Sequence, residues 1–408
     1  MSQRAKLCRL PRHLKAFTIV SLLLAPAMAA GQSSSNPFEA ARHVRGPFAI
    51  NPSLSVVDVG VDTNVFNEVS NPKSDFTAVF RPAADMWLQS GRVGLNARAQ
   101  VSWNYFQHYA SERYAGTDDR IRLEVQGSRF TPFGAASFLS TRDRISAEVD
   151  ARVRRNEWTA GGGADVNLGA KLTARVAANR FEARYNQAEG VGSFAAALDR
   201  REDWVGGSLR YRLTPLTTLV TDITGQMNRF VYESSRDADT LTILPGVEFD
   251  RAALVSGRGF VGYRRFDFLD PALEDFRGVV ASVDLAYVLR SSTRFGFTAD
   301  RNVEYSFDLV QPYFVSSGLG LRVTQQITER WSVSGYVSRR SLDYRAPLPA
   351  ALVPPRTDRV NYLSGTLGAR ISARTRVEGT AFYQRRSSIQ IRREFDGLRI
   401  VSSLIYEF

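Results

Sequence analysis

Strict alternation of apolar and polar residues recurs along this chain from Asn51 to its last residue. The segment 332–338, Ser-Val-Ser-Gly-Tyr-Val-Ser, is one example, and the segment 294–300, Arg-Phe-Gly-Phe-Thr-Ala-Asp, is another. Successive side chains of a β-strand point to opposite faces, so this period of two predicts strands with one apolar and one polar face. A chain built from such strands folds as a sheet whose two faces meet different surroundings.

The first 29 residues have the organisation of a cleaved export signal. A basic region without acids precedes an apolar run at 16–27 and a small-x-small cleavage site at 27–29. The run is about 15 residues long, whereas a membrane-spanning helix needs about 20. We therefore expect a cleaved signal at 1–29 and a flexible periplasmic leader at 30–50. The basic residues of the signal are Arg4, Lys6, Arg9, Arg12 and Lys15.

Residues 51–408 are expected to cross the membrane as a closed sheet. No stretch after the signal is apolar enough for a spanning helix, and only helices and closed barrels satisfy every backbone group in lipid. The prediction is an all-β, antiparallel transmembrane β-barrel of eighteen strands, with sixteen as the second choice and fourteen as the third. The expected strands are 52–66, 75–89, 93–109, 119–130, 135–142, 157–168, 172–185, 203–213, 217–232, 239–250, 257–268, 276–289, 293–307, 312–327, 330–344, 359–372, 375–388 and 396–408.

The predicted connections alternate in length, as they do in outer-membrane barrels. Short turns are expected at 90–92, 169–171, 214–216, 290–292 and 373–374. Longer polar loops are expected at 143–156, 186–202 and 345–358. This alternation predicts that both termini lie on the periplasmic side and that the long loops are extracellular.

The charge pattern predicts a polar interior with nearly balanced arginines and acids. Without the five basic residues of the signal, the formal net charge falls from +12 to +7, and no basic run with interleaved aromatics indicates nucleic acid as a partner. The balance favours a ladder of Arg–carboxylate pairs over a dedicated selectivity filter. The candidate lumen-lining residues are Asp58, Asp62, Asn64, Arg81, Arg98, Arg122, Arg210, Arg322, Arg370 and Arg376. The alternation also places Arg340 and Arg386 on the inner face.

The surplus of arginine collects in or beside the predicted extracellular loops, for example at Arg339, Arg359 and Arg393. Guanidinium groups suit phosphate geometry, so outer-membrane lipid and lipopolysaccharide are the expected neighbours. Capture of an acidic polymer is the alternative.

An enzyme has few candidates in this chain. The mature part contains only His43 and His108, no Gly-x-Ser-x-Gly elbow and no metal-ligand spacing. The only cysteine, Cys8, lies in the signal, so the mature chain has no thiol. We expect no catalytic residues, no metal and no cofactor. An outer-membrane hydrolase that uses His108 at the extracellular rim stays as an alternative.

Two resemblances sharpen these expectations. Ile400, Leu404, Tyr406 and Phe408 share one face of a terminal strand, which resembles the C-terminal signal that the barrel assembly machinery reads. The segment 60–66, Gly-Val-Asp-Thr-Asn-Val-Phe, resembles the opening of outer-membrane β-barrel porin families linked to exopolysaccharide export. This resemblance implies an outer-membrane, porin-like channel, in its narrower form a passive conduit for a polysaccharide with periplasmic export components as partners. A closed structural or surface-binding barrel is a further alternative.

Overall fold

Eighteen antiparallel strands close into one barrel in the computed structural model, which describes residues 41–144, 148, 152–186, 197–308, 310–345, 355–390 and 393–408. A three-residue strand, β1, precedes them. The strands are β1 His43–Arg45, β2 Phe48–Asp62, β3 Asp75–Ser90, β4 Val93–Phe106, β5 Tyr114–Val125, β6 Phe130–Thr141, β7 Arg155–Asn167, β8 Leu172–Tyr185, β9 Arg200–Thr214, β10 Thr217–Phe230, β11 Ala238–Phe249, β12 Val255–Phe268, β13 Phe276–Leu289, β14 Thr293–Tyr305, β15 Tyr313–Gln326, β16 Trp331–Arg345, β17 Arg356–Arg370, β18 Thr375–Ser387 and β19 Phe395–Glu407.

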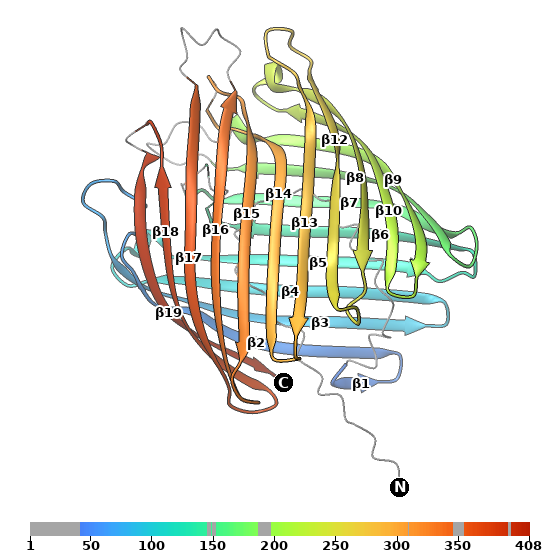
Figure 1. Ribbon diagram of the computed structural model, residues 1–408, viewed down its shortest axis with the longest axis horizontal. Coiled ribbons are helices and arrows are strands. Elements are labelled where there is room, and N and C mark those ends of the chain that lie inside the picture. Colours follow the sequence, from blue (N-terminus) through green and yellow to red (C-terminus); the bar gives the residue numbers. More distant parts are fainter. Residues whose placement is uncertain are drawn as a thin grey trace.

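Each barrel strand pairs with the next one along the chain, and β19 pairs back with β2. The ring therefore leaves no unpaired edge. In Figure 1 the front strands β13–β17 run at a steep angle to the back strands β2–β6, as tilted strands on opposite walls of a barrel do. The predicted class and the count of eighteen are confirmed, and the counts of sixteen and fourteen are wrong.

Most predicted strands differ from the observed ones by a few residues at their ends. The first strand ends at Asp62 and not at residue 66, because Asn67 N donates to Asn64 O in a turn. The larger errors are at β5, which is Tyr114–Val125 and not 119–130, and at β6, which begins at Phe130 and not at 135. At the start of β5 the reason is local. Thr117 and Asp119 are polar on the face that is otherwise apolar, so the alternation gives no signal there.

The predicted signal and most of the predicted leader lie outside the described residues. The end of the leader is ordered as a hairpin, in which His43–Arg45 pairs with Phe48–Ile50. Two short 3₁₀ turns, η1 (Ala110–Glu112) and η2 (Ser234–Arg236), occur in the loops. Within the ranges above, no helix combines the length and the apolar character needed to cross a membrane.

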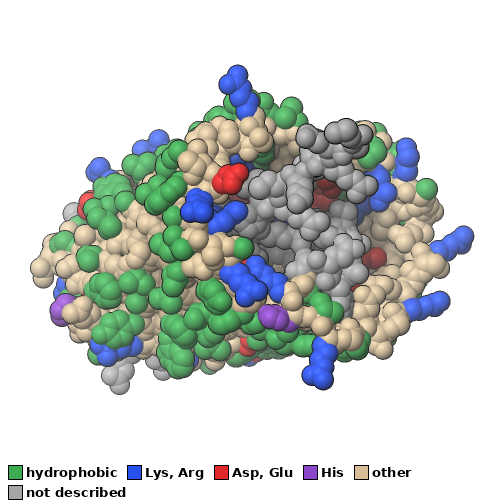
Figure 2. Space-filling model, turned by 90° about the horizontal axis from the view of Figure 1, so that it is seen from below, with side chains coloured by type: hydrophobic (Ala, Val, Ile, Leu, Met, Phe, Trp, Pro, Cys, Tyr) green, Lys and Arg blue, Asp and Glu red, His purple; other side chains and the backbone are tan. Residues whose placement is uncertain are grey.

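The outer wall of the barrel is apolar. On β15, Leu319, Leu321 and Val323 are 61%, 55% and 42% exposed, and they alternate with Gly320 and Arg322 on the inner wall. Figure 2 shows hydrophobic side chains over much of the visible wall and several Lys and Arg side chains protruding at its margins. An apolar wall of this extent suits lipid and not water.

The connections separate into two kinds, one at each end of the barrel. At one end, short turns join β3 to β4, β9 to β10 and β13 to β14. At the other end lie the longer loops, such as 63–74 between β2 and β3 and 306–312 between β14 and β15. Phe408 N donates to Pro52 O at 3.2 Å, which places the C-terminus beside the start of β2 at the short-turn end.

Candidate channel and its constriction

Charged residues of the inner wall form ion pairs between strands. Arg98 of β4 binds Asp85 of β3 with Nη1 at 2.9 Å from both carboxylate oxygens. Arg399 of β19 lies 3.7 Å from Asp58 and 3.5 Å from Asp62, across the closing seam of the barrel. Both pairs join neighbouring strands, as expected of an Arg–carboxylate ladder.

Other pairs reach over an intervening strand. Arg210 of β9 binds Glu248 of β11 through two bonds of 2.6 and 3.1 Å, passing over β10. Arg340 of β16 binds Asp300 of β14 through bonds of 2.6 and 2.8 Å, passing over β15. Bidentate pairs of this kind fix geometry as well as charge, so they brace the wall across three strands.

The remaining predicted lumen residues have varied surroundings. Arg122 lies 3.3 Å from Glu124 on its own strand and 3.9 Å from the centre of the Phe133 ring. Arg322 lies over the Tyr336 ring at 4.8 Å. Three further arginines share this inner face: Arg376, which pairs with Glu378 at 2.5 Å, Arg370, which is opposite Arg376 in the register, and Arg81, which is opposite Ser55.

Asn64 has a different place from the others. It lies in the turn after β2 and is 2% exposed. Its side chain donates to Glu68 O and Asp396 O at 2.9 Å each, and it accepts from Glu68 N at 2.8 Å. Asn64 therefore holds the turn against β19. Asp58 occupies a bulge in β2 with a φ of 57°, a left-handed conformation that is uncommon for a residue with a Cβ.

The inner wall differs between the two ends of the barrel. Near the short turns, the side chains of Asp85, Glu124 and Arg376 keep 31%, 24% and 24% of their surface accessible. Near the long loops, the side chains of Arg356 and Arg386 are only 1% accessible. The interior is thus open toward the short turns and filled toward the loops.

Glu148, from the loop between β6 and β7, joins opposite walls at the filled end. Ser306 Oγ donates to Glu148 Oε1 at 2.6 Å, and Phe307 N donates to Oε2 at 3.2 Å. Arg386 Nη1 of β18 donates to Glu148 O at 3.1 Å. Since β6 and β14 are eight places apart in the ring of eighteen strands, these contacts cross the lumen.

Arg236, in η2, is a second junction between loops. Its guanidinium donates to Ala197 O, Ser306 O and Pro312 O, the last at 3.1 Å, and it lies 4.6 Å from the centre of the Phe230 ring. Burial lowers the pKa of Arg236 to about 10, so the group stays charged at neutral pH. Its charge is therefore met by three carbonyl dipoles from two loops, the one before β9 and the one between β14 and β15.

The wall at this level supplies a third junction. Arg356 of β17 donates to both oxygens of Asp358, at 3.1 and 2.7 Å, and Arg386 donates to Asp358 Oδ2 at 2.6 Å. Arg356 also reaches Gln311 Oε1 at 3.5 Å in the β14–β15 loop. We call the whole set the constriction cluster; it comprises Glu148, Arg236, Ser306, Gln311, Arg356, Asp358 and Arg386.

The cluster was not among the residues that the sequence singled out as a site. Arg386 was expected to face inward, but Glu148, Arg236 and Ser306 carry no local signal, because their partners lie far away in the chain. The only general hint was that long loops of outer-membrane barrels carry polar residues, which does not say where the loops fold.

His108 lies at the rim beside Asp75, the first residue of β3. His108 Nδ1 lies 2.9 Å from Asp75 Oδ1, and Asp75 also accepts bonds from the backbone N of Phe76, His108 and Tyr109. Within the described ranges, His108 bonds to no hydroxyl. Asp75 therefore anchors the backbone after β4.

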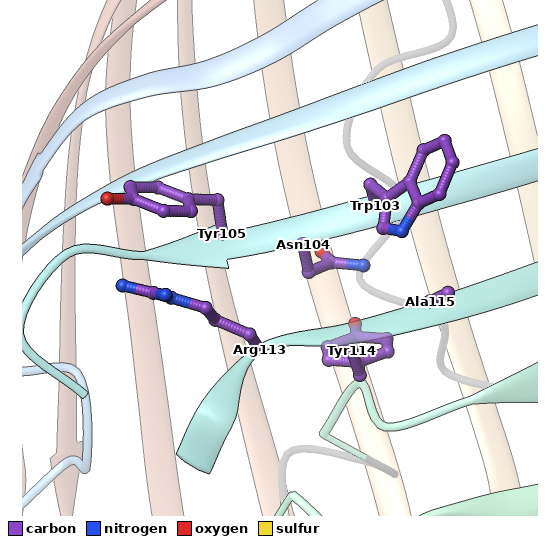
Figure 3. Close-up of a pocket in the computed structure, with 6 residues that line it drawn as sticks. All are labelled: Trp103, Asn104, Tyr105, Arg113, Tyr114 and Ala115. Atoms are coloured by element: carbon purple, nitrogen blue, oxygen red, sulfur yellow. The ribbon is translucent and has the colours of Figure 1, made fainter. Parts of the chain in front are cut away.

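A hollow on the same rim is lined by three aromatic side chains together with an arginine, an asparagine and an alanine. In Figure 3 the Arg113 guanidinium lies under the Tyr105 ring, 4.5 Å from its centre. The part of the chain that the structure describes has no group of three His, Cys, Asp or Glu residues placed to hold a metal. The hollow is lined by Trp103, Asn104, Tyr105, Arg113, Tyr114 and Ala115.

The predicted assembly signal lies at the closing seam. Tyr406 and Phe408 contact each other edge to face, with ring centres 4.7 Å apart. Ile400 and Leu404 are 60% and 42% exposed on the outer wall, the face that Tyr406 shares by alternation.

A closed barrel with an apolar outer wall and a charged inner wall has the construction of a transmembrane porin. The chain belongs to the family described as "Putative beta-barrel porin 2", whose model matches residues 36–408. No curated protein sequence matches it.

Solved porins of Pseudomonas aeruginosa share the fold. OccK2 (OpdF) superimposes with a TM-score of 0.51 at 12% identity, covering 88% of this chain and 98% of that one. A structure of OccK2 in complex with glucuronate gives 0.51 at 11% identity, with the same coverage. OpdK with vanillate gives 0.50 at 11% identity, covering 88% of this chain and 99% of that one.

Proposed function

We propose that this chain is an outer-membrane channel through which small hydrophilic solutes diffuse, with a weak preference for anions. The observation that carries the proposal is the change along the interior, from an accessible, charged wall at the short-turn end to the constriction cluster at the loop end. Such an interior passes water and small solutes through a narrow polar opening.

The preference for anions follows from the charges near the constriction. Four arginines and three acids lie there. They are Arg236, Arg356, Arg386 and Arg393, and Glu148, Asp308 and Asp358. The excess of one arginine is small, so the preference is weak. Vanillate and glucuronate, which occur in the titles of two structural neighbours, are both carboxylates and are suitable test solutes.

Export of a polysaccharide is less favoured. A polymer would have to pass where Glu148 binds Ser306 and Phe307 of the opposite wall, so the crossing segments would have to separate. A closed structural barrel is opposed by the accessible ion pairs of the other half. A rim hydrolase is opposed by the surroundings of His108.

The proposal includes an orientation. The basic and apolar residues at 1–29 support export across the inner membrane, and the terminal Phe408 supports insertion by the barrel assembly machinery. The short turns then face the periplasm and the long loops face outside. Lipopolysaccharide is the expected neighbour of the loop end of the wall.

Liposome swelling and planar-bilayer conductance test the function. We expect single-channel currents, and swelling with monosaccharides and with glucuronate but not with oligosaccharides of five or more units. Absence of current from correctly folded barrels would refute the channel. Equal swelling with long oligosaccharides would refute the constriction and favour a polymer conduit.

A further inference from the structure

Three arginines lie side by side on the outer wall, near the loop ends of β16, β17 and β18. Arg339, Arg359 and Arg385 are all exposed. Among the described residues, none of the three guanidinium groups has a hydrogen bond or an ion pair. Like charges in contact repel each other, so a patch without internal compensation attracts anions from outside. We call these three residues the arginine patch.

The register brings the patch together. Arg339 is opposite Asn361, and Asn361 is opposite Arg385, so these three residues form a row across the strands. Arg359 lies two residues further along β17, toward the loops. Because adjacent strands are about 4.8 Å apart, the backbones of Arg339 and Arg385 are about 10 Å apart. Their long side chains can therefore converge on one group, and the amide of Asn361 adds donors between them.

A row of apolar side chains lies next to the patch on the side away from the loops. Val337 is opposite Leu363, and Leu363 is opposite Tyr383. These side chains are 50%, 58% and 37% exposed. A ligand that touches both rows has an anionic part toward the loops and an apolar part toward the middle of the wall.

Elsewhere on the outer wall, several arginines near the loops are compensated by acids. Arg180 of β8 is opposite Asp203 of β9 and donates to it at 2.6 Å, and Arg201 lies 3.1 Å from the same carboxylate. Arg265 pairs with Asp267 at 2.6 Å. Asp203 thus takes the central place that the uncharged Asn361 takes in the arginine patch.

The described acids around the patch form no ion pair with it. The flanking segments 346–354 and 391–392 contain no Asp or Glu in their sequence. Two acids lie near the patch on this wall: Asp343, which accepts a bond from Thr357 Oγ1 at 2.8 Å, and Asp396, which is opposite Arg385 in the register and accepts a bond from Tyr383 OH at 3.4 Å. Neither acid forms an ion pair with the patch.

We propose that the arginine patch binds the phosphate groups of a glycolipid in the outer leaflet, with the neighbouring apolar row against its acyl chains. The inference rests on the proposed outer-membrane orientation. Guanidinium groups offer forked donors that match phosphate oxygens, and the boundary between apolar and charged wall is where a headgroup phosphate sits. The occupant is a lipid and not a free anion because the apolar row continues the site toward the membrane interior.

Purified full-length barrel in detergent, titrated with lipid A and followed by native mass spectrometry, tests the site. The patch variant carries Arg339→Gln, Arg359→Gln and Arg385→Gln. The matched control carries Arg180→Gln, Arg201→Gln and Arg265→Gln, which remove the same charge from compensated positions. We expect lipid A to bind the patch variant about tenfold more weakly, since each exposed pair contributes modestly, and to bind the control nearly as well as the unchanged protein.

A single substitution gives a sharper version of the test. Asn361→Asp places a carboxylate between Arg339 and Arg385, as Asp203 is placed elsewhere, and should weaken lipid A binding with almost no change in size. Asp203→Asn should strengthen binding or leave it unchanged. Equal binding by the Asn361→Asp variant and the unchanged protein would overturn the proposal.

Two further arms identify the ligand. Dephosphorylated lipid A should bind poorly, and equal binding of it would overturn the role of phosphate. Inorganic phosphate at the same concentration should not displace lipid A, and displacement would overturn the assignment to a lipid.

Conductance in planar bilayers should be the same in all variants, so loss of lipid binding with normal conductance separates this site from the channel. Heat-modifiable gel migration checks that each variant is folded.

Discussion

At the scale of single residues, Glu148 decides how firmly the two walls are joined. Burial raises the pKa of Glu148 above its ordinary value of 4.5, while the bond from Ser306 and the nearby Arg393 and Arg386 oppose the rise. Glu148 therefore binds its proton more tightly when the two walls are joined than when its carboxyl group is exposed to water. The contact between the two walls is therefore most stable in acid, and its stability falls as the pH rises from 4.5 through the raised pKa of Glu148.

We therefore predict that acid narrows the channel. Single-channel conductance should fall as the pH is lowered through this window. Glu148→Gln, which stays neutral, should conduct at the lower level at every pH. Glu274→Gln, at an exposed loop carboxyl, is the control and should behave as the unchanged protein. A Glu148→Gln channel that conducts more at neutral pH would show that the ionised form holds the walls together.

The same residue illustrates what the sequence could not provide. Alternation assigned Arg210 and Arg340 to the inner face, because a residue's face follows from its position in a strand. Glu148 lies in a loop, and its partner Ser306 is 158 residues away. No period in the sequence predicts a contact of that kind. Asn64 was wrongly assigned to the lumen because the alternation was continued past Asp62, where β2 ends. It lies in the turn that follows.

At the scale of elements, every strand was predicted and only the ends were misplaced. The alternation that gives one apolar face is a physical requirement of a wall in lipid, so it marks each strand. It fails at the start of β5, where Asp119 accepts from Thr117 Oγ1 and from Gln100 N. There, hydrogen bonds within the sheet satisfy polar groups on the outer face.

The seam between β19 and β2 depends on a residue without a side chain. A Cβ added at Gly60 would lie 2.0 Å from Ile400 O and 2.8 Å from Val401 Cα, both in the backbone of β19. We predict that Gly60→Val costs at least about 3 kcal/mol of unfolding free energy, the upper range for overpacking, because backbone cannot move aside. Urea titration of the refolded barrel measures the cost.

The control for this prediction is Gly365→Val, at a position in β17 where an added Cβ meets nothing within 4 Å. It should unfold within about 1 kcal/mol of the unchanged protein, as a surface substitution does. Equal stability of the two variants would mean that the seam can open without loss.

The last strand carries a prediction about assembly. Removing Phe408 should reduce the amount of barrel in the outer membrane, because the terminal aromatic resembles the signal for the assembly machinery. Tyr406→Ala should have a weaker effect of the same sign. Cell fractionation with heat-modifiable migration gives the measurement, and a normal level of the truncated protein would contradict the signal.

At the scale of the whole molecule, the inner wall is close to neutral. Many of its arginines are paired with acids such as Asp85, Asp165 and Glu248, so the channel should discriminate only weakly between small cations and anions. Any bias from exposed charges should fade at about 0.15 M salt, where the Debye length is about 8 Å, whereas a bias from the narrow constriction should persist.

Reversal potentials in a salt gradient, measured at low and at high ionic strength, check this prediction. Strong anion selectivity at high salt would mean that Arg236, Arg356 and Arg386 act as a filter. Strong cation selectivity would point to inner-wall acids such as Asp58 and Asp62 and would contradict the proposed preference.

The contacts that cross the lumen also set an order of events in time. Ser306 is 158 residues after Glu148, and Arg386 is 238 residues after it. Contacts between such distant segments form late, because the intervening chain must first be in place. The narrowing therefore completes only after β18 has joined the growing wall. Before that stage the wall still lacks its closing seam between β19 and β2, so closure of the ring and narrowing of the channel belong to the same late part of folding.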